Sequence, residues 1–303
     1  MPVMLRNNYS DFYLSRLASL DAIYIQSKEL DETNAPWEKL FKMKKSTRPF
    51  ENLSGVTGFG TFGTVGEGED YPSQSIGQLA DKKLTHTKYG MAWTISEEME
   101  DDDQDEIVAS LARAATRAAR FTKEVNFADT FNNSFGTETS ADGAAVCAAH
   151  TLYNGSSINN SAAADFGVSA FQTAMNHFAT LTDDKGVRVQ LEPAYVVGNP
   201  ANRWVFEEVL KSSLKPYTSD NETNVLKGLV ESVLWAELTD TDAFWLVAKP
   251  SDVNGFGLRG YNRQAWTVSN QPKVENSTLL SVIRARWSRG CYDWRQVYGS
   301  QGA

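Results

Sequence analysis

The sequence predicts an α+β fold, in which long strands, one long helix and a compact mixed unit follow one another along the chain. Apolar residues alternate with other residues over 84–95 and again over 279–288, which indicates half-buried strands. Between Ser96 and about Phe131, apolar residues recur every three or four positions and predict a helix. Short strand and helix patterns alternate between about 168 and 260, which is typical of an α+β unit.

The composition describes an ordered, acidic protein. Its 303 residues are 41% hydrophobic and 22% charged, which is ordinary for a globular protein and long enough for two domains. The formal net charge of −9 argues against a surface that wraps nucleic acid tightly, because that needs clustered Lys and Arg. Cys147 and Cys291 have neither metal nor redox spacing, so we expect no disulfide, metal or cofactor. We also expect a soluble chain, because it lacks a signal-peptide pattern and a run of about eighteen apolar residues.

The order of these patterns divides the chain into five predicted segments. The first is an arm with a helical portion and too little core to fold alone. Its spaced apolar residues are Leu5, Tyr9, Phe12, Leu17, Leu20 and Ile23. The predicted bounds are 1–44 for the arm, 45–95 for an extended hairpin, 96–167 for a spine helix and loop, 168–260 for the α+β unit and 261–303 for closing strands.

The hairpin segment contains a glycine-rich stretch, residues 55–77, in which GFGTFGTV matches the glycine-rich loop of protein kinases. The matching residues are Gly58, Gly60, Gly63 and Val65. A DFG tripeptide also occurs at 165–167, but a kinase needs a lysine in the strand after the loop and an H-R-D element, and neither is present. We therefore interpret the stretch as the flexible tip of a long hairpin, where glycine permits tight turns at an entropic cost.

The spine helix is predicted to begin at Ser96, which is placed to cap it. The following residues, Glu97 to Glu106, are acidic at eight of ten positions. Such a run is typical of a solvated helix start, where carboxylates interact favourably with the helix dipole, and less typical of a cation site. Beyond it the sequence predicts one apolar stripe on one long helix. The stripe consists of Ile107, Leu111, Ala114, Ala118, Phe121, Val125 and Ala128.

A catalytic-looking cluster follows the spine helix, in a stretch from 136 to 164 that is rich in Ser, Asn, Ala and Gly and is predicted to be a long loop. Asp142, Cys147 and His150 could in principle form a thiol nucleophile with its base. Nothing else in the sequence supplies an orienting group or an oxyanion site, and small apolar residues precede Cys147. The pattern favours a buried, inert thiol and no catalytic residue.

Two basic groups have alternative interpretations. Over 279–288, Ile283, Ala285 and Trp287 alternate with Arg284 and Arg286, so that one strand face is apolar and the other carries arginines. Residues 39–48 gather five basic side chains. Each group is either a solvated face or a contact with an acidic partner surface.

Four stretches carry a resemblance to a known family: TDDKGVRVQLEPAYVVGNP, LKSSLKPYTSDNETNVLKG, DAFWLVAKP and RARWSRGCYDWRQVYGS, at residues 182–200, 210–228, 242–250 and 284–300. With the order of the segments, they resemble the major capsid proteins of tailed bacteriophages, and more narrowly the Mu-type major head subunit, over about residues 40–303. The resemblance implies a capsid fold with an N-terminal arm, an extended glycine-rich hairpin loop, a peripheral domain built on the spine helix and closing strands, and a compact axial domain over 168–260.

The resemblance also implies a structural role without catalysis, as a major head protein whose pentamers and hexamers close an icosahedral shell around double-stranded DNA. It implies assembly in the host cytoplasm, residence in the virion, a portal, weak contact with DNA and no membrane. Because the arm begins almost at Met1, we expect any scaffold to be a separate chain. Two alternatives stay open: an encapsulin-like compartment shell with the same fold, and a thiol enzyme that uses Cys147 and His150.

The sequence nominates two sets of residues for contacts between subunits. The hairpin tip has apolar residues that it cannot bury locally, so we expect it to lie over an adjacent subunit. These residues are Phe59, Phe62, Val65 and Tyr71. The strand face with Arg284 and Arg286 is expected to meet an acidic surface of a neighbour, for which the run from Glu97 to Glu106 is a candidate.

Overall fold

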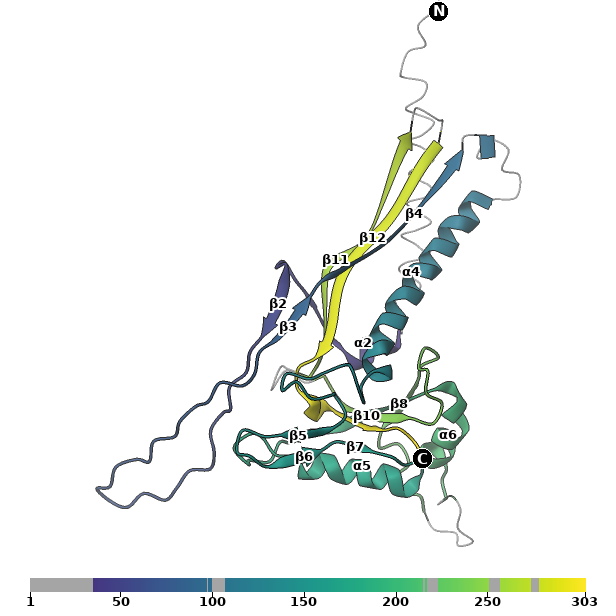
Figure 1. Ribbon diagram of the computed structural model, residues 1–303. Helices are drawn as coiled ribbons and strands as arrows, with labels where there is room; N and C mark the ends of the chain where they lie inside the picture. Colours follow the sequence, from purple (N-terminus) through teal and green to yellow (C-terminus); the bar gives the residue numbers. More distant parts are fainter. Residues whose placement is uncertain are drawn as a thin grey trace, which may run out of the picture.

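The computed structural model describes residues 35–96, 98–99, 107–214, 216, 223–250, 257–273 and 278–303. Residues 1–34 of the predicted arm and nearly all of the acidic run therefore lie outside the described residues. Figure 1 shows an elongated sheet with a long helix beside it, a compact mixed unit at its lower end and a hairpin that reaches out to one side.

The elongated sheet has four strands in the order β1-β11-β12-β4. The central pair is β11 (Leu258–Lys273) and β12 (Thr278–Cys291), which run antiparallel, and β4 (Thr87–Ser96) pairs antiparallel with the outer edge of β12. The short strand β1 (Lys42–Lys45) adds to β11 in parallel. We call this the long sheet. Strand β12 of this sheet confirms the predicted alternation of buried and exposed side chains: Ile283, Ala285 and Trp287 are buried and Arg284 is exposed.

Helix α4 (Ile107–Asn132) runs along one face of the long sheet (Figure 1). Its predicted apolar stripe is wrong over most of its length, because Leu111, Ala114, Ala118 and Phe121 are exposed. The buried side of the helix consists instead of small side chains and the stem of a lysine, and Ala115 on this side packs against Ile283 of β12. They are Ala112, Ala115, Thr116, Ala119 and Lys123, and Phe127 and Ala128 continue this face. Small residues let the helix approach the aromatic sheet closely, and a count of large apolar residues does not reveal that face.

The core between α4 and the long sheet is aromatic. The Trp287 ring stacks on Tyr89 with centroids 4.0 Å apart and meets Trp266 edge-on at 5.3 Å. Its indole N–H donates to the Asn126 side chain of α4 at 2.8 Å. At the lower end of α4, helix α2 (Pro36–Leu40) places Trp37 against Phe127, with ring centroids 5.0 Å apart. These contacts fix the helix, the long sheet and α2 relative to one another.

The compact unit is a five-stranded sheet in the order β7-β13-β10-β8-β9, with helices α5 (Val168–Thr180) and α6 (Arg203–Lys211). Its strands are β8 (Pro193–Gly198), β9 (Glu231–Leu234), β10 (Phe244–Ala248), β7 (Ser161–Ala162) and β13 (Val297–Ser300). Every residue of β10 is buried, so this strand is covered on both faces. Strand β8 lies between β9 and β10 in the sheet, so these two strands, which follow one another in the chain, do not pair with each other.

The stretch from 136 to 164 is more ordered than the predicted long loop. It contains the two-stranded ladder of β5 (Ala149–Thr151) and β6 (Ser157–Asn159), and its strand β7 pairs in parallel with β13. Two short 3₁₀ helices, Pro200–Asn202 and Trp294–Gln296, complete the fold. Strand β7 of this stretch and the last strand β13 thus belong to the five-stranded sheet, while Glu138 near the start of the stretch pairs with Arg289 of β12 at 2.8 Å. The five segment boundaries as such stay a prediction.

The position of Trp287 gives a stability prediction. We expect Trp287→Ala to lower the free energy of unfolding by about 3–5 kcal/mol, because it removes a buried indole and leaves a cavity between α4 and the long sheet. Trp204→Ala is the matched control, since Trp204 on α6 is 77% exposed and should cost less than about 0.5 kcal/mol. Urea unfolding of the free subunit measures both values. Equal midpoints for the two variants would contradict this account of the core.

Candidate functional site

The hairpin is rooted in a short ladder and then extends without a regular sheet (Figure 1). Strands β2 (Phe50–Leu53) and β3 (Lys82–Thr85) pair antiparallel, and the bridge between Val56 and Gln78 continues the pairing outward. Farther out, the Gln74 side chain accepts from the Gly60 N–H at 2.8 Å and donates to the Thr61 carbonyl at 3.0 Å. These contacts confirm the predicted hairpin.

The root of the hairpin is anchored to the body of the subunit by a small apolar cluster. Leu53 and Leu84 pack with Tyr261 of β11 and with Tyr292. The Tyr292 hydroxyl donates to the Ala80 carbonyl at 2.9 Å. A Cβ atom at Gly55 would lie 2.6 Å from that hydroxyl, so a larger residue at this point would force Tyr292 to move. The hairpin therefore leaves the subunit in a defined direction.

The tip of the hairpin exposes its apolar side chains. Phe62 is 92% exposed and Tyr71 is 88% exposed, while Phe59 and Val65 are also exposed. Gly58 and Gly68 have φ values of 71° and 83°, a region that favours glycine. A free subunit thus leaves several large apolar side chains in water, which is typical of an interaction surface.

The second predicted set, Arg284 and Arg286, lies on the face of the long sheet that points away from α4. In the strand register Arg284 stands opposite Gly90 of β4, and Arg286 stands opposite Lys88. The four strands contain no Asp or Glu, and their basic residues number three each in β1, β11 and β12 and one in β4. The hairpin between Pro49 and Asp81 has the opposite composition, with five acidic residues and no Lys or Arg.

The basic face extends beyond the two arginines that the sequence nominates. Arg259 of β11 is 2% exposed, stands opposite Lys42 of β1, and its Nη1 atom has no hydrogen-bond partner. Burial lowers the pKa of Arg259. Lys88 joins the face from β4. The two long strands contain no acidic residue, which the sequence alone shows and which points to a basic surface. Only the strand register shows that the basic side chains lie on one face of the sheet.

His86 lies between β3 and β4, where the hairpin joins the long sheet, and it is buried. Its Nε2 is 3.0 Å from the Ser46 hydroxyl and its Nδ1 is 3.0 Å from the Ser288 hydroxyl. Burial lowers the pKa of His86; Glu51 opposes this shift, and Arg286 and Arg263 add to it. The neutral ring therefore links the base of the hairpin to Ser288 of β12 and to Ser46.

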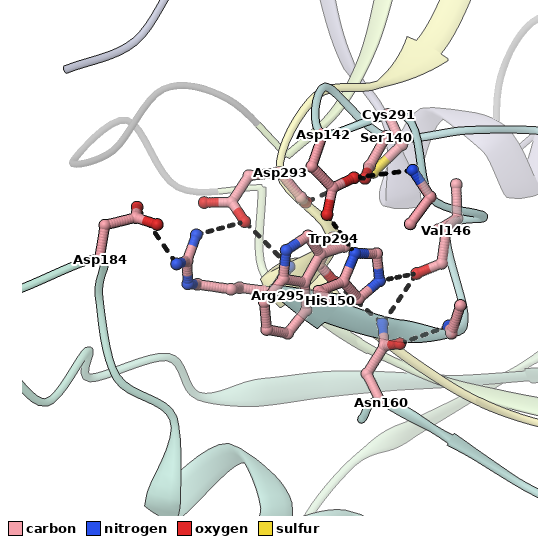
Figure 2. Close-up of polar contacts among 12 residues, drawn as sticks. Ser140, Asp142, Val146, His150, Asn160, Asp184, Cys291, Asp293, Trp294 and Arg295 are labelled. Carbon is pink, nitrogen blue, oxygen red and sulfur yellow. Dashed lines mark hydrogen bonds and ion pairs between the residues drawn. The ribbon is translucent and has the colours of Figure 1, made fainter. Parts of the chain in front are cut away.

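The catalytic-looking cluster is a structural network (Figure 2). His150 is fully buried, its Nδ1 is 2.6 Å from an Asp142 carboxylate oxygen, and its ring stacks on Trp294 with centroids 4.2 Å apart. Burial acts to raise the pKa of Asp142, but hydrogen bonds from His150 and Ser140 outweigh it, so the pKa is lowered. The Nε2 atom of His150 faces the Val146 carbonyl at 3.4 Å, and no thiol stands there.

Asn160 and Arg295 extend this network to the C-terminal strand. The Asn160 amide donates to the Val146 and Val297 carbonyls, each at 2.8 Å, and accepts from the Ala148 N–H (Figure 2). Arg295 makes ion pairs with Asp184 and Asp293, each at 3.2 Å. A cavity of about 310 Å³ lies between this network and the hairpin root, and the charged side chains in its lining, Asp142, Asp184, Asp293 and Arg295, are already paired.

Cys147 lies apart from the His150 contacts described above. It is buried, and burial raises its pKa to about 12, so the thiol stays protonated at neutral pH. Cys291 is also buried and free. The structure therefore brings Asp142 and His150 together and leaves Cys147 out, which agrees with a buried, inert thiol. Among the described residues, no group of three or more His, Cys, Asp and Glu side chains is arranged to hold a metal ion.

The comparisons with known proteins agree with a shell subunit. A family model described as phage capsid protein matches residues 80–300. The chain belongs to the phage capsid protein family. No curated protein matches the sequence significantly. The match confirms the resemblance to phage capsid proteins and the role of a major capsid shell protein of the virion, while the narrower Mu-type assignment stays a prediction.

Solved structures confirm the capsid fold. The capsid of cyanophage P-SCSP1u matches with a TM-score of 0.61 at 12% identity, over 88% of each chain. A chain from Microbacterium phage Oxtober96 gives a TM-score of 0.56 at 10% identity, over 89% of this chain and 91% of its own. The mature capsid of bacteriophage PhiM1 gives 0.57 at 12% identity, over 87% and 85%. No helix in the described part of the capsid protein is long and apolar enough to cross a membrane.

The buried clamp at His86 predicts a pH effect. Because the pKa of His86 is lowered in the folded state, the unfolded chain takes up a proton more readily once the pH falls below the ordinary histidine value of about 6.5. Stability present above that pH should therefore decline toward pH 5. His86→Gln keeps a donor and an acceptor without titrating, so its stability should fall less over the same range. Thermal unfolding at pH 7 and pH 5 measures the difference, and equal losses would contradict the clamp.

Proposed function

We propose that this capsid protein assembles through pentamers and hexamers into an icosahedral shell around double-stranded DNA, with the hairpin as the main contact between neighbours. The observation that carries the proposal is the hairpin tip, whose apolar side chains stay exposed in their own subunit, Phe62 and Tyr71 almost completely. The role of the shell protein itself follows from the family, and the resemblance to tailed-phage head proteins supports the ring stoichiometry and the DNA cargo.

The energetics of the tip favour a docked state in the shell. Ordering a backbone residue costs about 1–2 kcal/mol, so a glycine-rich tip gains little from being fixed in a free subunit. Burial of a Phe-sized side chain stabilises by about 1.5–3 kcal/mol. Phe59, Phe62, Val65 and Tyr71 together can offset much of the ordering cost, but only where a neighbour supplies the cover.

The charges of the tip and of the long sheet favour one particular binding surface for the tip on the neighbouring subunit. Glu67, Glu69 and Asp70 lie at its outer end, and the long sheet presents Lys88, Arg284 and Arg286 on the face away from α4. We propose that the acidic tip of one subunit lies over the basic face of the next. The acidic run from Glu97 to Glu106 is the other candidate partner from the sequence, and nearly all of it lies outside the described residues.

The remaining parts of the proposal rest on the resemblance alone. A separate scaffolding chain and a portal would direct closure of the shell in the host cytoplasm, and packaged DNA would be contacted only weakly, in keeping with the net charge of −9. The subunit would carry out no reaction.

Deletion of the tip tests the main contact. A variant without residues Gly58 to Glu69 should give a folded, soluble subunit that no longer closes into particles, because the root cluster and the Gly55–Leu79 pairing remain. Phe62→Ser with Tyr71→Ser is the milder variant, and Trp204→Ser at another exposed aromatic is its control. Electron microscopy and sedimentation measure whether particles form. Normal particles from the deletion variant would contradict the proposal.

Removal of positive charge from the long sheet tests this proposed binding surface. Arg284→Gln with Arg286→Gln should weaken assembly at low salt and flatten its dependence on salt, because the surface ion pairs are screened over about 8–10 Å at moderate ionic strength. Arg203→Gln with Lys227→Gln removes the same charge from exposed positions in the compact unit and serves as the control. Light scattering at increasing salt measures assembly. If assembly of both double variants depends on salt as assembly of the unchanged protein does, the proposed contact between the acidic tip and the basic face is wrong.

A further inference from the structure

The inner part of the hairpin rests on the compact unit of its own subunit. The hairpin has an outgoing limb, residues 54–66, and a returning limb, residues 67–81. Figure 1 shows the turn between β5 and β6 beside the inner part of these limbs. Tyr153 belongs to this turn, and a Cβ atom at Gly77 would lie 2.7 Å from its ring. Across the hairpin, the Thr57 N–H donates to the Gly77 carbonyl at 3.0 Å, so the limbs are joined where they pass Tyr153.

Lys185 provides a second contact, farther out along the hairpin. Its ammonium donates to the Ser75 carbonyl of the returning limb at 3.1 Å and lies 5.5 Å from the centroid of the Tyr153 ring. A Cβ atom at Gly60 of the outgoing limb would lie 3.9 Å from the Cβ atom of Lys185. Lys185 therefore lies against both limbs. We call Tyr153 and Lys185 the brace.

Hydrogen bonds within the compact unit hold the two residues of the brace in place. The Asp183 carboxylate accepts from the backbone N–H of Lys185 at 2.9 Å. The neighbouring Asp184 carboxylate accepts from the backbone N–H of Tyr153 at 3.3 Å and pairs with Arg295 at 3.2 Å. The turn with Tyr153 and the turn with Lys185 are thus tied to each other and to the C-terminal part of the chain, which gives the hairpin a firm support.

The brace leaves the outer end of the hairpin uncovered. It contacts glycine residues and backbone of the limbs, whereas Phe62 is 92% exposed and Tyr71 is 88% exposed. The brace therefore does not hide the apolar side chains of the tip, but it fixes the direction in which they stand. Without such support a glycine-rich chain samples many directions, because glycine adopts positive and negative φ values with similar ease.

We propose that Tyr153 and Lys185 hold the hairpin in one direction in the free subunit and thereby speed assembly. A neighbour can bind only a hairpin that points toward it, so a larger fraction of correctly directed hairpins favours docking, and less conformational freedom is lost on binding. Both side chains of the brace are accessible to solvent, so the hairpin can still shift slightly to fit its neighbour. The first part of the proposal concerns the free subunit alone, and only the effect on assembly rests on the hairpin contact proposed above.

A pair of spin labels measures the direction of the hairpin in the dilute, unassembled full chain. One label is attached at Thr64→Cys on the tip and the other at Gln172→Cys on α5, and both positions are exposed. The natural Cys147 and Cys291 are buried, so they should stay unlabelled. The width of the distribution of distances between the labels reports how far the hairpin moves relative to the compact unit.

Removal of the brace should broaden this distribution. In Lys185→Met with Tyr153→Ala we expect a width at least about twofold larger than in the otherwise unchanged chain, because the glycine-rich limbs lose their support. Lys227→Met with Trp204→Ala removes a lysine and an aromatic ring from exposed positions elsewhere in the compact unit. This control should leave the width as it is.

Gly77→Ala gives an independent variant. Its added methyl group meets the Tyr153 ring, so that the ring or the limb must move and the contact is broken. Gly77→Ala should therefore broaden the distribution by itself, but it should add nothing in a chain that already carries Tyr153→Ala. This non-additivity distinguishes a lost contact at Tyr153 from a general loss of stability.

Light scattering tests the effect on assembly. At equal subunit concentration, the initial rate should be at least about threefold lower for Lys185→Met with Tyr153→Ala than for the control pair, because fewer hairpins point toward a neighbour. Equal distance distributions with and without the brace would overturn the whole inference, while the hairpin contact would stand or fall by deletion of the tip. A broader distribution with an unchanged rate would overturn the role of the brace in assembly.

Discussion

The packing of α4 on the long sheet is the contact on which the rest of the subunit depends. Trp287 stands at its centre, stacked on Tyr89 of β4 and hydrogen-bonded to Asn126 of α4. β4 leads directly into His86 and the hairpin, so the direction of the hairpin is set by the same strand that this tryptophan fixes. The small residues of α4, such as Ala115, allow the close approach that makes the aromatic stack possible.

Local patterns predicted those elements in which one strong signal decides the structure. The alternation around Ile283 identifies a half-buried strand whatever its partners are, and residues 168–180 show a helical period that the structure confirms as α5. The glycine-rich stretch was correctly predicted as part of a hairpin; Lys82 and Lys83 do lie in strand β3 after it, but the sequence has no H-R-D element, which a kinase requires. In each case the residues that carry the signal are neighbours in the sequence.

The sequence could not reveal features that depend on distant partners. Asn160 stabilises the stretch 136–164 by hydrogen bonds to residues on both sides of it, including Val297, so its order depends on a strand that comes more than a hundred residues later. The face of α4 could not be chosen because both of its faces are apolar, and the buried one has the smaller side chains. The basic face likewise needs the pairing of Lys88 with Arg286 across β4 and β12.

The short root of the hairpin has a mechanical consequence. The ladder of β2 and β3 pairs only four residues on each strand, while more than a dozen residues separate it from the outermost point of the tip. An extended chain of that length spans about 45 Å, so a rotation of about ten degrees at the root sweeps the outer end through about 8 Å. The hairpin is thus a lever pivoted near His86. Such a lever lets one folded subunit reach neighbours set at slightly different angles without any change in its core.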